Sequence, residues 1–269
     1  MTMQYEQLNI NLQGAQAVST WIFNSNLTDQ AGIAFNDWDA LLAKAQETPG
    51  IVRILFTGTA SSIIPPGTYD MTDVILAGDT AFAAVNVDDV VFANLLNIEL
   101  LTLRIGAGIA NAVPTFQYNS GTSETLTLSR ANFVVGAAAT APMFALTGGT
   151  TLSLTAVDSS FFSGNAGVPV FTIDATSSLS TVGSAGVAGN NWGGGPGSPA
   201  FVVVTAGGSF TLGLATGDIF WSSNQVTGPT IVARGDDYES AVVADWSGTE
   251  PENVKTALDR IAAAIGPIA

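Results

Sequence analysis

The 269-residue chain contains no cysteine and no histidine, and only seven of its residues are lysine or arginine. Without cysteine it forms no disulfide and holds no metal through thiolates. Without histidine it lacks the commonest general base and the commonest metal ligand. We therefore expect no catalytic residue, no metal and no cofactor, and we predict that the chain is not an enzyme.

Basic residues are also too few for a nucleic-acid partner. The chain has 22 acidic residues and a formal net charge of −15, whereas binding to phosphates requires a basic face. An anionic membrane surface is disfavoured for the same reason. No apolar run reaches the roughly 18 residues of a membrane-spanning helix, and the N-terminus lacks the pattern of a secretory signal. Neither nucleic acid nor membrane is expected as a partner.

What the chain does contain is a repeat. Five prolines stand 28, 27, 30 and 30 residues apart, and the first four are each followed two places later by phenylalanine. They are Pro114, Pro142, Pro169, Pro199 and Pro229. Between them, short runs of alternating apolar residues are separated by Gly, Ser, Thr and Asn, which is typical of strands and turns. A propeller blade needs about 40 residues, so the period indicates a solenoid of stacked parallel strands.

Stacked repeats would place equivalent side chains above one another, about 4.8 Å apart. We expect an aromatic core ladder of Phe116, Phe144, Phe171 and Phe201. An aliphatic ladder is expected from Leu126, Leu152, Leu179 and Leu212. A second aromatic register, with a small residue three places later in each repeat, runs through Phe133, Phe161, Trp192 and Phe220. About seven coils are predicted between residues 51 and 233, with irregularity near residues 86–112.

Upstream of the repeat, the sequence predicts a short helix. Asn36 is expected to cap it, and Trp38, Leu41, Leu42 and Ala45 give it one apolar face. A strand over 51–56, a Pro-Gly-Thr-Tyr turn at 66–69 and a strand ending at Gly78 follow.

This order of elements, over residues 33–79, resembles the entrance to right-handed parallel β-helices of the pectate-lyase-like superfamily, which includes phage tailspikes. The resemblance implies an all-β fold, a right-handed parallel β-helix with a short N-terminal capping helix. It carries no activity across, because the paired carboxylates of the enzymes in that superfamily are not recognisable here.

The C-terminal residues carry a narrower motif. Asp245-Trp246-Ser247-Gly248 and Pro251 precede a predicted C-terminal helix with an apolar stripe of Val254, Leu258, Ile261 and Ile265. This element is similar to one that recurs in structural proteins of tailed bacteriophages, especially fibres and head or tail appendages. The stripe requires a partner, which is either the β-helix itself or a trimeric bundle of three such helices.

Other polar and aromatic residues are candidates for sites. Asp88-Asp89 and Asp236-Asp237 have no EF-hand spacing, so turns are preferred to calcium binding. Asp158 and Asp218 are interpreted as turn residues. Trp221 and Phe162 are predicted to face outward, where they would form a subunit contact in preference to a strip that stacks on sugars.

Three regions follow from these patterns. Residues 1–35 are predicted to be an N-terminal arm and anchor, 36–235 the capping helix and β-helix, and 236–269 an acidic linker and C-terminal helix. Only five charged side chains fall between residues 114 and 231, which favours an assembly contact along the flank of the coils.

With the resemblance to phage proteins, these patterns imply a non-enzymatic virion surface protein. We expect a homotrimeric capsid decoration or head or tail appendage that binds other virion structural proteins, of the capsid or tail. The alternatives are a tailspike that depolymerises host polysaccharide and an adhesin that binds a host glycan.

Overall fold

The computed structural model describes residues 18–26, 34–58, 61–80, 83–95, 97–184, 190–193, 200–213, 218–220, 226–227 and 231–234. Over these residues the protein is mostly β, with parallel strands in every sheet and a single α-helix. The predicted all-β class with parallel pairing is therefore confirmed. The predicted C-terminal helix lies outside the described residues.

The strands form three larger sheets and one pair. The ten-stranded sheet contains, in spatial order, β2 (Ala34–Phe35), β1 (Ser19–Phe23), β3 (Val52–Phe56), β6 (Val74–Gly78), β9 (Asn97–Glu99), β12 (Ser123–Ser129), β15 (Thr151–Val157), β18 (Ser178–Ser184), β21 (Ser209–Gly213) and β24 (Ile231–Arg234). The seven-stranded sheet contains β22 (Ile219–Phe220), β19 (Asn191–Trp192), β16 (Ser160–Ser163), β13 (Asn132–Val135), β10 (Thr102–Ile105), β7 (Ala84–Asn86) and β4 (Ser62–Ile63). The five-stranded sheet contains β11 (Phe116–Tyr118), β14 (Phe144–Leu146), β17 (Phe171–Ile173), β20 (Val202–Val204) and β23 (Val226–Thr227), and β5 (Gly67–Asp70) pairs with β8 (Val90–Ala93).

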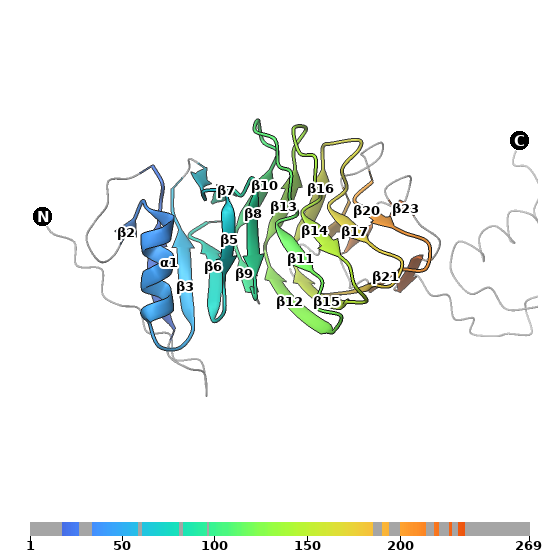
Figure 1. The fold of residues 1–269 in the computed structure, drawn as a ribbon, viewed down its shortest axis with the longest axis horizontal. Coiled ribbons are helices and arrows are strands. Elements are labelled where there is room, and N and C mark those ends of the chain that lie inside the picture. The colour runs from blue at the N-terminus through green and yellow to red at the C-terminus, as the bar shows by residue number, and fades with distance from the viewer. Residues whose placement is uncertain are drawn as a thin grey trace, which may run out of the picture.

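From β9 onward the chain visits the three larger sheets in a fixed rotation. Each visit to a sheet adds the next parallel strand beside the strand of the previous visit. Strands of successive visits therefore follow one another along the long axis of the molecule (Figure 1). Side chains separated by about 28 residues in the sequence become neighbours because each lies on an adjacent strand.

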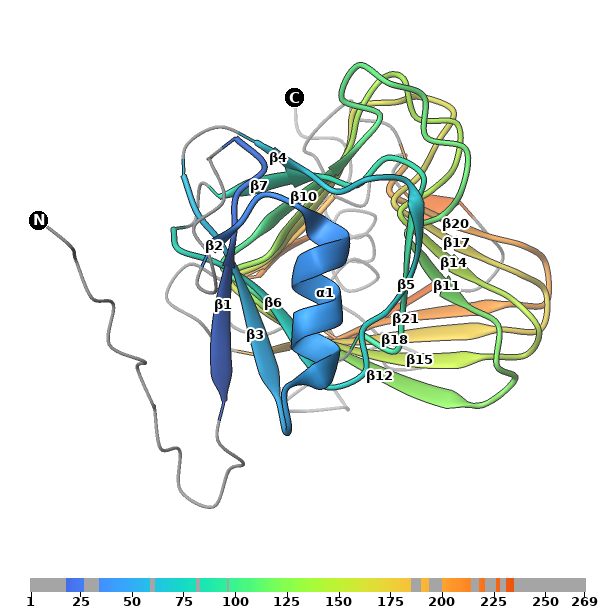
Figure 2. The ribbon, with the colours of Figure 1, turned by 60° about the vertical axis from the view of Figure 1, so that its left-hand side comes forward.

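Helix α1 (Trp38–Glu47) lies at the N-terminal end of this array, across the end of the sheets (Figure 2). Its N-cap is Asp37, whose side chain accepts a hydrogen bond from the Ala40 N–H, so the cap lies one residue later than the predicted Asn36. The predicted apolar face is buried: Trp38, Leu41, Leu42 and Ala45. The Trp38 ring contacts Phe23 and stacks on Phe56, which seals the end of the core.

The predicted arm over residues 1–35 is shorter in the structure. β1 pairs with β3 along five residues, and β2 pairs with β1, so both strands belong to the ten-stranded sheet. Phe23 is fully buried because it occupies an inward position of that sheet, in register with Phe56. The alternation Trp21-Ile22-Phe23 is thus a strand signal, and only residues before 18 remain as a candidate arm.

Two aromatic columns fill the core beneath the larger sheets. Phe116, Phe144 and Phe171 are in register, and successive ring centroids lie 4.6 and 4.5 Å apart. In the seven-stranded sheet, Phe133, Phe161 and Trp192 stack in the same way, at 5.3 and 4.8 Å. All of these rings are buried.

The register departs from the predicted columns at two places. Phe171 pairs with Val202, so Phe201 is buried but stands one residue before the ladder position. The predicted aliphatic ladder is confirmed at one step only. Leu152 pairs with Leu179 as predicted, but Leu126 pairs with Leu154, and Leu212 pairs with Thr181. The strands contain leucines at every second position, so a shift of two residues leaves the burial pattern unchanged and the sequence pattern alone does not reveal it.

Candidate functional site

The cross-section of the molecule changes abruptly between β9 and β12. In the ten-stranded sheet, Ile75 pairs with Asn97, 22 residues later, whereas Asn97 pairs with Thr127, 30 residues later. The short β9 covers only Thr127–Ser129 of the seven-residue β12, while β15 pairs with β12 along its full length. Among the described strands, residues 123–126 therefore have a neighbour on one side only, and the wider part of the molecule overhangs the narrower part.

A depression of about 610 Å³ lies at this step. We call it the step cleft. Its lining comes from the β5–β6 turn, from β8 and the residues after it, and from β11, β12 and their connection: Thr72, Asp73, Phe92, Ala93, Asn94, Leu95, Gln117, Tyr118, Asn119, Ser120, Ser123, Glu124 and Thr125. Two carboxylates and several amides and hydroxyls are present, and no basic side chain is among the described residues that line the cleft.

Tyr118 is the most unusual residue of the step cleft. Its side chain is 7% exposed, and its hydroxyl makes no hydrogen bond with any described residue. Burial raises the pKa of Tyr118 well above its ordinary value, and the nearby negative charge of Glu124 raises it further. Glu124 itself accepts a hydrogen bond from the Ser120 hydroxyl. A buried hydroxyl without a hydrogen bond carries a desolvation cost. Because the oxygen atom itself is buried, it is not presented to a ligand in the cleft.

The rim of the step cleft is held by a local network. Asp70 accepts hydrogen bonds from the Asn94 amide at 2.9 Å and from the Thr72 hydroxyl at 2.7 Å. The Asn94 hydrogen bond is the largest cause that lowers the pKa of Asp70. Asn94 has a φ of +61°, a conformation that asparagine tolerates better than most residues. These contacts fix the β8 side of the cleft and occupy Asp70 structurally.

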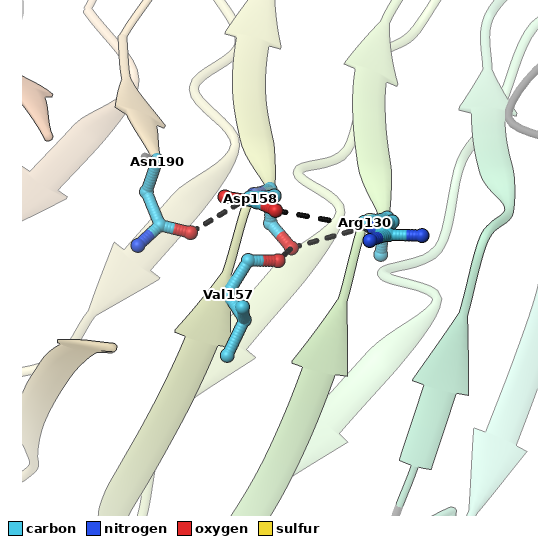
Figure 3. Close-up of polar contacts among 6 residues, drawn as sticks. Arg130, Val157, Asp158 and Asn190 are labelled. Atoms are coloured by element: carbon cyan, nitrogen blue, oxygen red, sulfur yellow. Dashed lines mark hydrogen bonds and ion pairs between the residues drawn. The ribbon is translucent and has the colours of Figure 1, made fainter. Parts of the chain in front are cut away.

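The acidic residues of the turns between the ten-stranded and seven-stranded sheets also serve the fold. Asp158 has a φ of +48° and lies 3.9 Å from the Arg130 guanidinium (Figure 3). On the following strand, Asn190 accepts from the Ser159 N–H at 2.9 Å and donates to the Ala156 carbonyl at 3.1 Å. Asp218 continues the series by accepting from the Asn190 N–H and, at 2.9 Å, from the Trp192 indole N–H.

Asp88 and Asp89 are likewise engaged by the backbone. Asp88 accepts from the Gly106 N–H, and Asp89 accepts from the Ala112 N–H. Burial is the largest cause that raises the pKa of Asp88. In the part of the chain that the structure describes, no group of three or more Asp or Glu residues could hold a metal ion. Within the same residues, no helix has the length and apolar character needed to cross a bilayer.

The outer face of the seven-stranded sheet exposes apolar side chains with little charge. One outward column runs along it in register: Ile63, Asn86, Arg104, Val134 and Phe162. Ile63 is 55% exposed and Phe162 is 36% exposed, and Arg104 is the only charged member of the column. In the adjacent column, Asn132 donates to the Thr102 hydroxyl and accepts from the Ser160 hydroxyl, so these polar groups satisfy one another.

The outer face of the ten-stranded sheet differs in kind. On β12, β15 and β18 the described outward positions other than Val157 are hydroxyl side chains: Ser123, Thr125, Thr127, Ser129, Thr151, Ser153, Thr155, Ser178 and Ser180. Such a face is uncharged yet well hydrated. We therefore regard the seven-stranded face, where Ile63 and Phe162 are exposed, as the candidate assembly surface, and the hydroxyl face as solvent-facing.

The predicted interface residues divide between described and undescribed parts. Phe162 lies on β16 and points outward, as its alternation with the buried Phe161 requires. Trp221 and the helical stripe of Val254, Leu258, Ile261 and Ile265 lie outside the described residues. The step cleft was missed in the sequence. Its one signal was the missing proline between residues 86 and 112, which marks the change in length between successive visits to a sheet.

Comparison with protein-family models, with curated proteins and with solved structures gave no match to this chain.

Proposed function

We propose that the chain winds into a right-handed parallel β-helix and serves as a non-enzymatic structural protein of a tailed-phage virion. In this proposal it forms a homotrimer on the virion surface, as a capsid decoration or a head or tail appendage. It contacts other virion proteins through one end of the array. The assignment to a phage depends on the C-terminal motif.

The closed β-helix is supported by the order in which the chain visits its sheets. Between β3 and β24 the chain returns seven times to the ten-stranded sheet, and every pairing is parallel. A solenoid requires this rotation, and it also requires inward columns of like residues, such as the stacked rings of Phe116, Phe144 and Phe171. Solution scattering that gave a compact, isometric particle would contradict a solenoid.

The observation that carries the assembly is the outer face of the seven-stranded sheet. Ile63 and Phe162 are exposed on it, and Arg104 is the only charge of their column. Association of three copies along this face would cover these side chains and leave the hydroxyl face in solvent. Sedimentation equilibrium at micromolar concentration tests this directly: we expect three times the chain mass of 27.5 kDa, and a stable monomer would overturn the trimer.

The location on the virion is tested by imaging. An antibody raised against the purified chain should label phage particles at regular surface positions. Particles from a phage with the gene deleted should lose both the antibody label and the corresponding density in averaged images. Absence of label from intact particles would contradict a virion role.

The step cleft supports the alternative, a protein that binds or cleaves a host glycan. Asp73 and Glu124 are both in its lining, and carboxylates and amides bind sugar hydroxyls. Incubation with host-envelope polysaccharide separates the cases. Release of oligosaccharides would establish a depolymerase, and binding without release would establish an adhesin. If neither binding nor release is observed, the structural role stands.

A further inference from the structure

The free edge of β12 faces the step cleft. The Ser129 carbonyl accepts from the Leu100 N–H on the β9 side, and the Thr122 carbonyl accepts from the Thr151 N–H on the opposite side. Since the backbone groups of a parallel strand alternate between its two sides, those of Ser123 and Thr125 point to the β9 side. No described strand pairs with these two residues there, and both line the cleft.

The register of the sheet brings the N-terminal end of β1 into line with this edge. Ser19 pairs with Val52, which pairs with Val74, one position before the column of Asn97 and Thr127. Ser19 therefore stands in the column of Leu126. The N-terminal end of β1 therefore lies at the same end of the sheet as the free edge.

We propose that residues 7–13 of the same chain add as a short strand to this free edge of β12 and fill the step cleft. The strand would lie at the level of β9, three strand spacings or about 14 Å from β1. Residues 14–18 and the bonds that flank them extend to roughly 20 Å, which is sufficient to reach it. The inference does not depend on the virion function.

The composition of residues 7–13 fits the cleft. The segment alternates amides with apolar residues, Gln7-Leu8-Asn9-Ile10-Asn11-Leu12-Gln13, and contains no charge. An alternation of this kind is a strand pattern. Amide N–H groups can donate to the Asp73 and Glu124 carboxylates, and an acidic segment would be repelled by them. The apolar residues match Phe92 and Leu95 in the lining.

Docking in this way has a consequence for the anchor. Residues 7–13 would be held against the body of the molecule, so they would not be free to bind a particle, and the anchor role would pass to residues 236–269.

Because the chain has no cysteine, disulfide trapping can test the proposal in the full-length protein. Cysteine is introduced at Asn9, Ile10 or Asn11, each together with Thr125→Cys. Ser153→Cys replaces Thr125→Cys in the matched control, because Ser153 is exposed on the same face of the next strand, which has neighbours on both sides. After mild oxidation we expect an intrachain disulfide between Thr125→Cys and the introduced N-terminal cysteine. Its yield should differ about tenfold between neighbouring positions among Asn9, Ile10 and Asn11, because successive side chains of a strand face opposite sides.

Four results would overturn the proposal: interchain disulfides, which would assign the cleft to a segment of a second copy; equal yields at all three positions; equal yields with Ser153→Cys; or no disulfide. A second readout is hydrogen exchange at the Ser123 and Thr125 amides. The full-length variant Ile10→Pro cannot complete a strand ladder, and we expect it to exchange these amides about tenfold faster than the unmodified chain. Unchanged exchange would contradict docking.

Discussion

Among individual side chains, the stacked rings connect adjacent strands directly across the core. Phe144 is fully buried between Phe116 and Phe171, with both ring planes within 15° of parallel to its own. It also makes an edge contact with Phe133 of the second aromatic column. A ring in this position contacts both neighbouring strands and the opposite sheet at once, so few rearrangements could fill the space that it leaves.

Replacement of Phe144 by alanine should therefore lower the free energy of unfolding by about 3–5 kcal/mol, through lost burial and the cavity that remains. Chemical denaturation followed by circular dichroism measures this. The exposed Phe162 provides the control, and its alanine variant should change the stability of the monomer by less than about 1 kcal/mol. A loss below 1 kcal/mol at Phe144 would place that ring outside the core.

Tyr118 gives a prediction about pH. Burial holds the pKa of its phenol above the ordinary value of 10.0, so the folded state retains the proton that the unfolded state releases. The stability that this group contributes is complete below pH 10 and is lost as the pH rises through the raised folded-state pKa. The unmodified chain should lose stability above pH 10 more steeply than Tyr118→Phe, as thermal melting across that range would measure. Parallel curves for the two proteins would show that the phenol ionises without cost in the folded state.

Between strands, the residue type that a turn tolerates depends on how closely the turn approaches the backbone of the preceding pass, a pass being one circuit of the chain through the three larger sheets. Gly136 and Gly164 occupy equivalent positions after β13 and β16. The N–H of Gly136 donates to the Ile105 carbonyl of β10, and the N–H of Gly164 donates to the Val135 carbonyl of β13. A Cβ atom on Gly136 would overlap the carbonyl of Gly106. At Gly164 the nearest atoms would lie 3.5 Å away, an ordinary contact distance.

The two glycines therefore form a matched pair. Gly136→Ala should destabilise the fold by roughly 2 kcal/mol or more because the backbone of the turn must shift. Gly164→Ala should be nearly neutral, since the added methyl group meets no close atom. Differential scanning calorimetry of the two variants checks this, and equal melting temperatures would mean that the turn at Gly136 yields without cost.

A buried polar chain adds specificity to a second set of turns, those between the ten-stranded and seven-stranded sheets. Asn190 is 1% exposed and bonds to the backbone of the preceding pass and to Asp218 of the next. Asn190→Leu would leave the Ser159 N–H and the Ala156 carbonyl without this partner. We expect the free energy of unfolding, measured by urea denaturation, to fall by about 1–3 kcal/mol for each buried group that is left without a hydrogen bond. Full stability of the variant would show that water replaces the amide.

For the assembled protein, the sparse charge of the seven-stranded face predicts where the proposed trimer is sensitive. Phe162→Asp places a carboxylate in the proposed contact, and we expect association to weaken by about thirtyfold or more, in line with a hot-spot loss of ~2 kcal/mol. Ser153→Asp, on the hydroxyl face, is the control and should leave the assembly intact. Sedimentation velocity distinguishes the two. Loss of trimers with Ser153→Asp alone would move the contact to the ten-stranded sheet.

Much of the fold could be read from the sequence because its repeat is nearly regular. The period of prolines and phenylalanines determined the parallel strands, the inward position of Phe144 and the outward position of Phe162, since alternation and stacking follow from local geometry. The apolar face of α1 was equally legible, because Trp38, Leu41, Leu42 and Ala45 fall on one side of any helix that contains them.

Only the tertiary structure decided the register and the step cleft. Leu126 pairs with Leu154 and not with Leu152. The sequence does not distinguish these two registers, because strands with apolar residues at every second position bury the same face after a two-residue shift. The lining of the cleft, including Asp73, Asn94 and Glu124, comes from three successive passes of the chain. These residues meet because a 22-residue pass is followed by a 30-residue pass, and the sequence does not state which strand positions the shorter pass leaves uncovered.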